Sequence, residues 1–240
     1  MSFQHKGLSG FSLRREGDEV IKWTRGIEST KILKESYMMQ LREMTFETMY
    51  PIKTVEIKSV MDLIDFGEYF DFRMPLIEAD SAFYYPHGER LFAQVRASFW
   101  ARSYRPVGGF KEIIKAYLLG IEPSCMKLEV EEQLAEASDY YPSGFCHGDF
   151  GLANMLIVED SIHMIDYTPS FIQTPLIDIA TLEMSMVHME VSQWHLDLLK
   201  ILKNDYKGYA DKIDILRKCK VLGFQNYDSD YHRKIFDGIK

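Results

Sequence analysis

The chain has 240 residues and a modest acidic excess, with 28 Lys and Arg against 36 Asp and Glu and a net charge of −8. This balance argues against a general affinity for nucleic acid, whose phosphates require a basic surface. A hydrophobic content of 46% is enough for a full core and argues against wholesale disorder. The length allows one large domain or two small lobes.

The cysteines and the chain start indicate the compartment. The number of cysteines is odd and no two have CxxC spacing, so neither a disulfide framework nor a zinc site is expected; they are Cys125, Cys146 and Cys219. The N-terminus lacks the apolar core of a secretory signal. No run reaches the ~18–20 apolar residues of a membrane span. We therefore expect a cytoplasmic protein without a membrane partner, and these features leave its oligomeric state open.

The first part of the chain predicts a small sheet with one helix. Residues 11–24 read as a hairpin with a turn at Glu16-Gly17-Asp18. Residues 27–44 predict a helix whose apolar stripe is Ile32, Leu33, Tyr37, Met38, Leu41 and Met44. Two more strands are expected over 54–59 and 70–77. Upstream, Gly7 and Gly10 fit either a hairpin turn or a loop whose backbone N–H groups approach a phosphate.

The rest of the chain is mostly helical by pattern. Helices are predicted over 88–103, 109–120 and 125–138. Thr174-Pro175 is typical of an N-cap followed by proline at the first helical position, and this helix is expected to reach about residue 203. A last helix is predicted over 205–221. The domain boundary is placed after residue 77, giving lobes of residues 1–77 and 78–240.

A polar cluster separates two groups of these helices. Short apolar runs at 145–146 and 155–158 flank His147-Gly148-Asp149, and a second hairpin arm, 162–165, ends on Asp166. Asp149, Asn154 and Asp166 are therefore expected at strand ends or in the loop between strands. Taken singly, each is also typical of a turn. Together their oxygens suit Mg²⁺, which usually takes further ligands from substrate phosphates.

The ordered set of His147-Gly148-Asp149, Asn154, Ile165-Asp166-Tyr167 and Asp178-Ile179-Ala180 resembles the aminoglycoside phosphotransferase and choline kinase-like family. These are small-molecule kinases with the protein-kinase fold. The resemblance implies an α+β, bilobal, protein-kinase-like fold. Its N-terminal lobe would be a small antiparallel sheet with one helix, and its larger C-terminal lobe would be mostly helical. It also implies ATP or GTP and Mg²⁺ as cofactors.

The resemblance gives roles to residues of the cluster. Asp149 would accept or orient the proton of the acceptor hydroxyl, and Asn154 and Asp166 would hold Mg²⁺ on the phosphates. His147 would support the loop rather than act as a base. Asp178 would brace the same loop.

Nucleotide contacts are expected from the first lobe. By resemblance, Lys22 pairs with the ATP α- and β-phosphates, and Glu35 orients it through an ion pair, with Glu28 as the alternative partner. The segment around Ile77 would offer backbone hydrogen bonds to adenine as a hinge between lobes. Gly7 and Gly10 would form the phosphate loop.

The leading hypothesis is an ATP- and Mg²⁺-dependent kinase that phosphorylates a hydroxyl of a small molecule such as an amino-sugar, a sugar or an amino alcohol. Acidic residues after Asp178 either favour a cationic acceptor or form a solvated helix face; they are Glu183, Glu190 and Asp197.

Three alternatives remain open. A Ser/Thr protein kinase is disfavoured by Gly148, where protein kinases usually carry arginine, and by the lack of an activation segment before Asp178. A non-catalytic pseudokinase is disfavoured because Lys22, Asp149, Asn154 and Asp166 are all retained. A metal-dependent hydrolase would need several His and Asp ligands around two metals, and the motif holds one histidine.

Overall fold

The computed structural model describes residues 4–6, 11–45, 53–54, 69–77, 80–81, 89–159, 161–187, 191–224 and 230–239. They form two compact units. Unit 1 joins Met1–Tyr85 with Asn154–Pro169, and unit 2 joins Pro86–Ala153 with Ser170–Lys240. The boundary expected after residue 77 differs from this division, because the later hairpin belongs to unit 1, where it pairs with strands from the first part of the chain.

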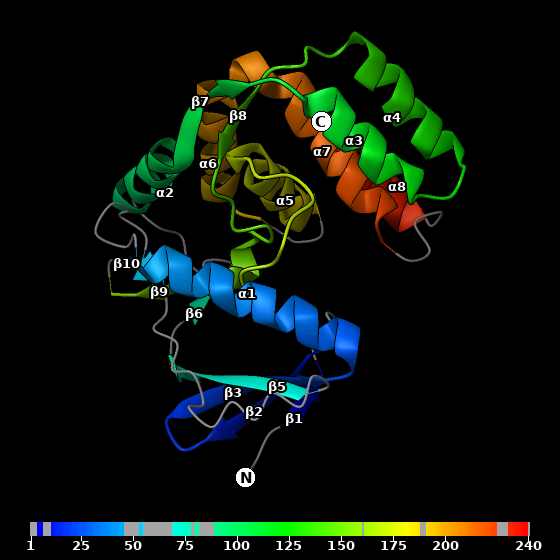
Figure 1. Cartoon of the computed structure of the whole chain (residues 1–240). Helices are drawn as coiled ribbons and strands as arrows, with labels where there is room; N and C mark the ends of the chain where they lie inside the picture. The colour runs from blue at the N-terminus through cyan, green and yellow to red at the C-terminus, as the bar shows by residue number, and fades with distance from the viewer. Residues whose placement is uncertain are drawn as a thin grey trace. The chain divides into compact units, whose positions relative to one another are not determined.

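The main sheet of unit 1 is antiparallel, in the order β1-β2-β3-β5. Its strands are β1 (Gln4–Lys6), β2 (Ser12–Glu16), β3 (Glu19–Arg25) and β5 (Tyr69–Pro75). Helix α1 (Ile27–Thr45) lies across one face of this sheet (Figure 1). The core between them contains Phe11, Leu33, Phe70, Phe72 and Met74. The predicted hairpin and first helix are therefore confirmed.

The buried face of α1 matches the predicted stripe only in part: Leu33, Tyr37 and Leu41 pack in or against the core, as expected. Ile32 and Met38 are 44% and 61% exposed, whereas the polar Ser36 and Gln40 are buried. Tyr37 contacts the sheet, with its ring 5.7 Å from that of Phe70. Polar residues occupy this face because they find partners there, and the Ser36 hydroxyl donates to a backbone carbonyl.

A second small sheet of unit 1 carries the predicted hairpin. Its order is β4-β10-β9-β6, with strands β4 (Lys53–Thr54), β10 (Ser161–Met164), β9 (Met155–Val158) and β6 (Asp80–Ser81). The β9–β10 hairpin agrees with the sequence-based prediction within one residue. Of the strand predicted over 54–59, the part after Thr54 lies outside the described residues, as do Gly7 and Gly10.

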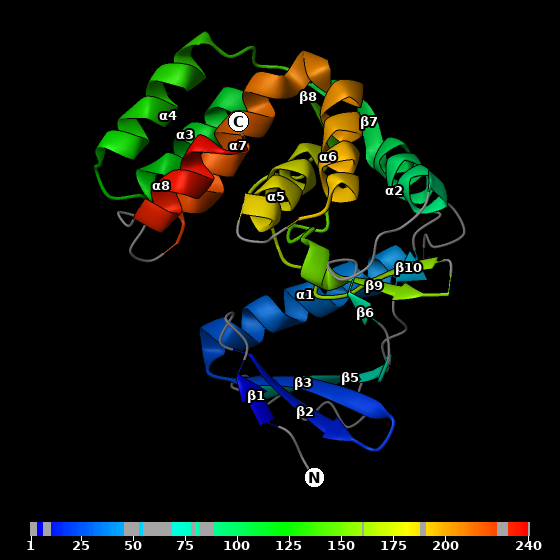
Figure 2. The ribbon, with the colours of Figure 1, turned by 180° about the vertical axis from the view of Figure 1, so that it is seen from behind.

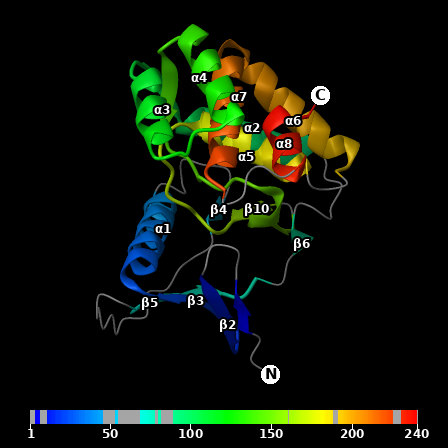
Figure 3. The same cartoon turned by 90° about the vertical axis from the view of Figure 1, so that its right-hand side faces the viewer.

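Unit 2 is built on helices, with one short two-stranded sheet. Its elements are α2 (Glu89–Arg102), β7 (Ser103–Val107), α3 (Phe110–Leu119), α4 (Cys125–Glu136), β8 (Tyr141–Gly144), α5 (Pro175–Val187), α6 (Gln193–Asp205), α7 (Ala210–Leu222) and α8 (Asp230–Asp237). Short 3₁₀ turns are formed by Leu152–Asn154 and Lys207–Tyr209. Helix α5 is buried along almost all of its length and packs against α6, α7 and α8 (Figure 2). Helix α4 packs against α3 and α7 (Figure 3).

Two predictions for unit 2 are wrong in detail. The helix expected from 174 to about 203 is two helices, because α6 has its own start, where the N–H of Ser192 donates to Nδ1 of His195 at 3.1 Å. The short strand expected before Asp149 is β8, at Tyr141–Gly144, and it ends before the apolar run at 145–146. Gly144 is required there, since a Cβ atom would lie 1.9 Å from the carbonyl oxygen of Arg102.

The three cysteines are free: Cys146 and Cys219 are buried and Cys125 is exposed. Burial raises the pKa of both buried thiols to about 12, so they stay protonated at neutral pH. Among the helices that the structure describes, none combines the length and the apolar character needed to cross a bilayer.

Candidate active site

In unit 1, the centre of the candidate site is an ion pair between Lys22 and Asp166. Lys22 lies on β3 and is 5% exposed, and its Nζ donates to Oδ1 of Asp166, 144 residues further along the chain. The ring of Phe11 lies 5.0 Å from the same Nζ. A buried ammonium needs such a partner, because an uncompensated buried charge costs several kcal/mol. The structure thus brings together two residues to which the sequence assigned neighbouring roles.

Asp166 has an unusual backbone conformation just after β10. Its φ is 64°, a left-handed value that aspartate tolerates better than most residues. The segment is held by hydroxyl groups: Ser36 donates to the carbonyl of Tyr167, and Thr168 donates to the carbonyl of Asp166 at 3.3 Å. The Asp166 side chain remains 40% exposed. Residues held in sparsely populated conformations cluster at functional sites.

Asn154 lies at the same end of the β9–β10 hairpin as Asp166. Its carbonyl accepts the N–H of Ile165 at 3.1 Å, beyond the last strand pair, Met155 with Met164. An amide oxygen and a carboxylate at this end are hard ligands that suit Mg²⁺, with water and phosphate oxygens completing the shell. Within the described ranges, no group of three or more His, Cys, Asp or Glu is arranged to hold a metal ion. The assignment of Asn154 and Asp166 to Mg²⁺ stays a prediction.

The expected ion pair between Lys22 and Glu35 is wrong. Glu35 is exposed on α1, because the helix turns Leu33 and Ser36 toward the sheet, and Lys22 pairs with Asp166 instead. Glu28, the alternative partner, is also exposed.

The expected hinge is described only in part. Ile77 is half-buried and packs against the core of unit 1, and the N–H of Leu76 donates to the carbonyl of Asp18 at 2.7 Å. Glu78 lies outside the described residues, as do Gly7 and Gly10 of the predicted phosphate loop. Nucleotide contacts of all these residues stay predictions.

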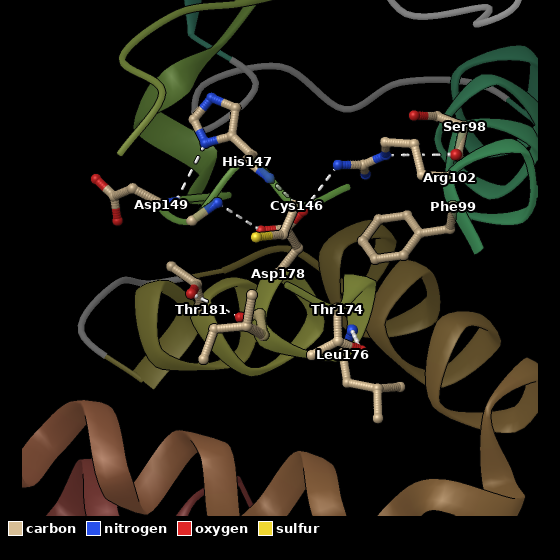
Figure 4. Close-up of polar contacts among 12 residues, drawn as sticks. Ser98, Phe99, Arg102, Cys146, His147, Asp149, Thr174, Leu176, Asp178 and Thr181 are labelled. Atoms are coloured by element: carbon tan, nitrogen blue, oxygen red, sulfur yellow. Dashed lines mark hydrogen bonds and ion pairs between the residues drawn. The ribbon is translucent and has the colours of Figure 1, made fainter. Parts of the chain in front are cut away.

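In unit 2, Asp178 braces the loop that carries Asp149, as predicted (Figure 4). Asp178 lies in the first turn of α5 and is fully buried. Its Oδ2 accepts the N–H of His147 at 2.8 Å, and its Oδ1 accepts the N–H of Gly148 at 2.9 Å. Burial raises the pKa of Asp178, while the Arg102 guanidinium and the two N–H groups oppose that shift.

Arg102 is a supporting residue that the sequence did not reveal. Its Nη1 donates to Oδ2 of Asp178 at 2.8 Å, and its guanidinium lies 4.8 Å from the ring centre of Phe99 and 5.4 Å from that of Phe150. Figure 4 shows it reaching from α2 toward Asp178. No sequence signal marks this pair, because 76 residues separate its members.

Lys220 is the second supporting residue that was missed. From α7, its Nζ donates to the carbonyl of Gly148 at 2.6 Å and to the hydroxyl of Thr181 at 2.8 Å. Burial lowers the pKa of Lys220, and the charges of Asp149 and Asp178 oppose this. Lys220 lies at a helical spacing from buried Ile213 and Leu216, which marks it as inward-facing but does not identify its partner.

The loop itself fixes the backbone of Asp149. His147 is 1% exposed, and its Nδ1 accepts the N–H of Asp149 at 3.3 Å, so it supports the loop as expected. Gly148 adopts a φ of 80°, which favours glycine. The carbonyl of Asp149 accepts the N–H of Gly151 at 2.7 Å. In Figure 4 the Asp149 carboxylate points away from Asp178, outward from the loop.

Of the acidic residues after Asp178, the two that the structure describes, Glu183 and Asp197, do not lie at one common site. Glu183 is fully buried, with Oε1 3.1 Å from Nη1 of Arg217. Asp197 lines a groove of about 900 Å³ between α2 and α6, on the exposed side of α2. Arg102 lies on the buried side of that helix, so the groove faces away from the loop. Glu190 lies outside the described residues.

Solved structures with the same fold are small-molecule kinases. One is a ternary complex of aminoglycoside phosphotransferase APH(4)-Ia with ADP and hygromycin B. The match covers 99% of this chain and 91% of the phosphotransferase chain, with 11% sequence identity and a TM-score of 0.64. For the choline kinase LicA from Streptococcus pneumoniae, the match covers 99% of this chain and 90% of the kinase chain, with 16% sequence identity and a TM-score of 0.62. For a choline/ethanolamine kinase family protein from Mesorhizobium loti, it covers 99% of this chain and 93% of that protein, with 18% sequence identity and a TM-score of 0.52.

No protein-family model and no curated protein sequence matches the chain. The structural likeness, at these identities, is a likeness of fold. It confirms the α+β protein-kinase-like fold that the resemblance implied.

Proposed function

We propose that this protein is a kinase that transfers the terminal phosphate of ATP, or of GTP, to a hydroxyl group of a small molecule. One observation carries the proposal: the buried Lys22 pairs with Asp166, so a predicted phosphate ligand and a predicted metal ligand lie side by side. The fold shared with small-molecule kinases supports it.

In this reaction the chain would act mainly by positioning charge. The Lys22 ammonium would bind phosphate oxygens, and Asp166 with the amide oxygen of Asn154 would hold Mg²⁺, whose positive charge would offset that of the phosphates. Phosphoryl transfer needs little covalent work from the protein, so a fixed cation and fixed oxygen ligands supply much of what is required.

Asp149 is proposed to orient the acceptor hydroxyl and accept its proton. Its backbone is fixed by the bonds to His147 and Gly151, and its carboxylate points outward from the loop. A positioned base of this kind typically contributes a factor of ~10²–10⁴ to the rate.

The acceptor is proposed to be an amino-sugar, another sugar or an amino alcohol. The solved structures of similar fold include a complex with hygromycin B and a choline kinase. An ATP-dependent reaction of this kind belongs in the cytoplasm, the compartment also expected from cysteine usage.

A panel of amino-sugars, sugars and amino alcohols, with nucleotide consumption as the readout, tests this function. At least one acceptor should raise ATP or GTP consumption well above the rate without acceptor. Mg·ATP should also raise the melting temperature, because a ligand of the native state stabilises it. Nucleotide binding without consumption for any acceptor would replace the kinase with a non-catalytic nucleotide-binding protein.

The metal assignment has its own test. Asp166→Ala should abolish Mg²⁺-dependent nucleotide binding measured by calorimetry, because the carboxylate ligand is lost. The same titration with EDTA should give equal, weak binding for the wild type and the variant. Intact Mg·ATP affinity in Asp166→Ala would remove Asp166 from the metal site.

A further inference from the structure

The peptide groups around Gly148 are held from both sides within unit 2. The Gly148 N–H donates to Asp178 on α5 at 2.9 Å, and the Gly148 carbonyl accepts from Lys220 on α7 at 2.6 Å. This carbonyl belongs to the peptide bond that leads into Asp149. Rotation of that peptide would change the direction of the Asp149 side chain, and the bond from Lys220 opposes it.

The donor to the Gly148 carbonyl is a charged lysine, although a neutral donor could make the same hydrogen bond. Removing an ammonium from water is costly, and burial lowers the pKa of Lys220 accordingly. Its second partner, the Thr181 hydroxyl, is set to accept because it donates its own proton to the carbonyl of Ile177 at 2.8 Å. The negative charges of Asp149 and Asp178 favour the charged ammonium and so oppose the fall in the pKa of Lys220. The loop itself, His147 to Ala153, contains no lysine or arginine.

We propose that Lys220 is a positioning residue for phosphoryl transfer, which fixes the peptide between Gly148 and Asp149 and compensates the charge of the Asp149 carboxylate. This inference rests on the proposed kinase function. Lys220 acts through Asp149 and is not itself placed on the substrate.

Turnover provides the first test. Lys220→Met should lower kcat about 10–100-fold, because small displacements of a catalytic group are that costly. The KM for nucleotide should stay within about threefold, because nucleotide contacts are assigned to other residues. Lys218→Met is the matched control on the same helix; Lys218 pairs with Asp214 at 2.9 Å, and its loss should leave kcat unchanged. Wild-type kcat in Lys220→Met would overturn the proposal.

Two further variants separate charge from hydrogen bonding. Lys220→Gln keeps an N–H donor near the Gly148 carbonyl but removes the charge, and kcat should still fall about tenfold. Lys220→Arg keeps the charge and should recover part of the loss. Lys220→Gln replaces Lys220→Met as the test if Lys220→Met does not fold. A wild-type kcat in Lys220→Gln would show that the charge of Lys220 has no role.

Hydrogen–deuterium exchange tests the positioning without any acceptor. Exchange in peptides covering 145–151 should quicken in Lys220→Met, while the exchange of α3 and α4 stays as in the wild type and in Lys218→Met. Unchanged loop exchange would overturn the positioning role. If no acceptor is phosphorylated by the wild type, the kinase proposal fails, and the exchange result still decides whether Lys220 holds the loop.

Discussion

At the scale of single residues, buried charges divide into two groups. Lys22 and Asp178 are buried next to segments predicted to do chemistry, and each pairs with a residue far away in the sequence. Glu183 is equally buried, but its partners are Arg217 and Lys203, which are not residues of the predicted site. Burial alone therefore does not identify the site. A site is indicated where a buried charge fixes a neighbour that remains accessible.

The first residue-scale prediction concerns Asp149. Asp149→Asn keeps the size of the side chain but cannot accept a proton, so kcat should fall by a factor of ~10²–10⁴. Nucleotide affinity, measured by calorimetry with Mg·ATP, should stay near that of the wild type. Unchanged turnover would exclude Asp149 as the base.

A second prediction compares Lys22 with Glu35. Lys22→Met should weaken Mg·ATP binding at least tenfold, because a charge-assisted contact to phosphate contributes about 1.5–3 kcal/mol. Glu35→Ala should leave the affinity unchanged, since Glu35 is exposed and Lys22 pairs with Asp166. Fluorescent-nucleotide titration measures both variants. A comparable loss in Glu35→Ala would restore the pairing that the sequence suggested.

At the scale of elements, sequence periodicity predicted most helices and the β9–β10 hairpin, but only part of the buried face of α1. The α1 stripe was right at Leu33 and wrong at Ile32 and Met38. It left out Ser36 and Gln40, which are polar but find partners on the inner face. The break between α5 and α6 was missed because apolar residues continue across it. Capping at Ser192, rather than a change in hydropathy, starts α6. Local patterns therefore predict elements better than they predict element ends.

A prediction at this scale concerns the start of α3. Asp139 accepts the N–H groups of Gly109 at 2.8 Å and Lys111 at 3.0 Å, and these bonds lower its pKa. Asp139→Ala should lower the melting temperature by a few degrees at pH 7, because two N–H groups at the helix start lose their acceptor. Differential scanning calorimetry measures the shift.

The pH dependence of this effect has a definite sign. Because the pKa of Asp139 is lower in the folded protein, its stabilisation is fully present above the unfolded value of about 3.9 and is lost as the pH falls through the folded value. The difference in melting temperature between the wild type and Asp139→Ala should therefore shrink below about pH 4. A difference that stays constant down to pH 3 would contradict the role of the ionised carboxylate.

For the molecule as a whole, the motif order predicted the fold, and the structural neighbours confirm it at 11–18% identity. Asp149, Asn154, Asp166 and Asp178 became candidates because they lie close together in the sequence, and Asp178 braces the loop as expected. Arg102 and Lys220 were not identified, because they reach the loop from helices 76 and 72 residues away from their partners. One sequence carries no record of such long-range pairs. The supports within the motif were therefore predictable, and the supports from distant helices were not.

Buried and exposed ion pairs of unit 2 should contribute differently to the stability of the protein. Glu183, fully buried on α5, joins that helix to Arg217 on α7 at 3.1 Å and to Lys203 on α6 at 2.8 Å. Glu183→Gln leaves these cations without their buried counter-charge, so the free energy of unfolding in urea should fall by about 3–5 kcal/mol. Arg233→Met removes the exposed pair with Glu129 at 2.7 Å and should cost less than about 1 kcal/mol. Equal losses in the two variants would show that Glu183 does not hold these helices together.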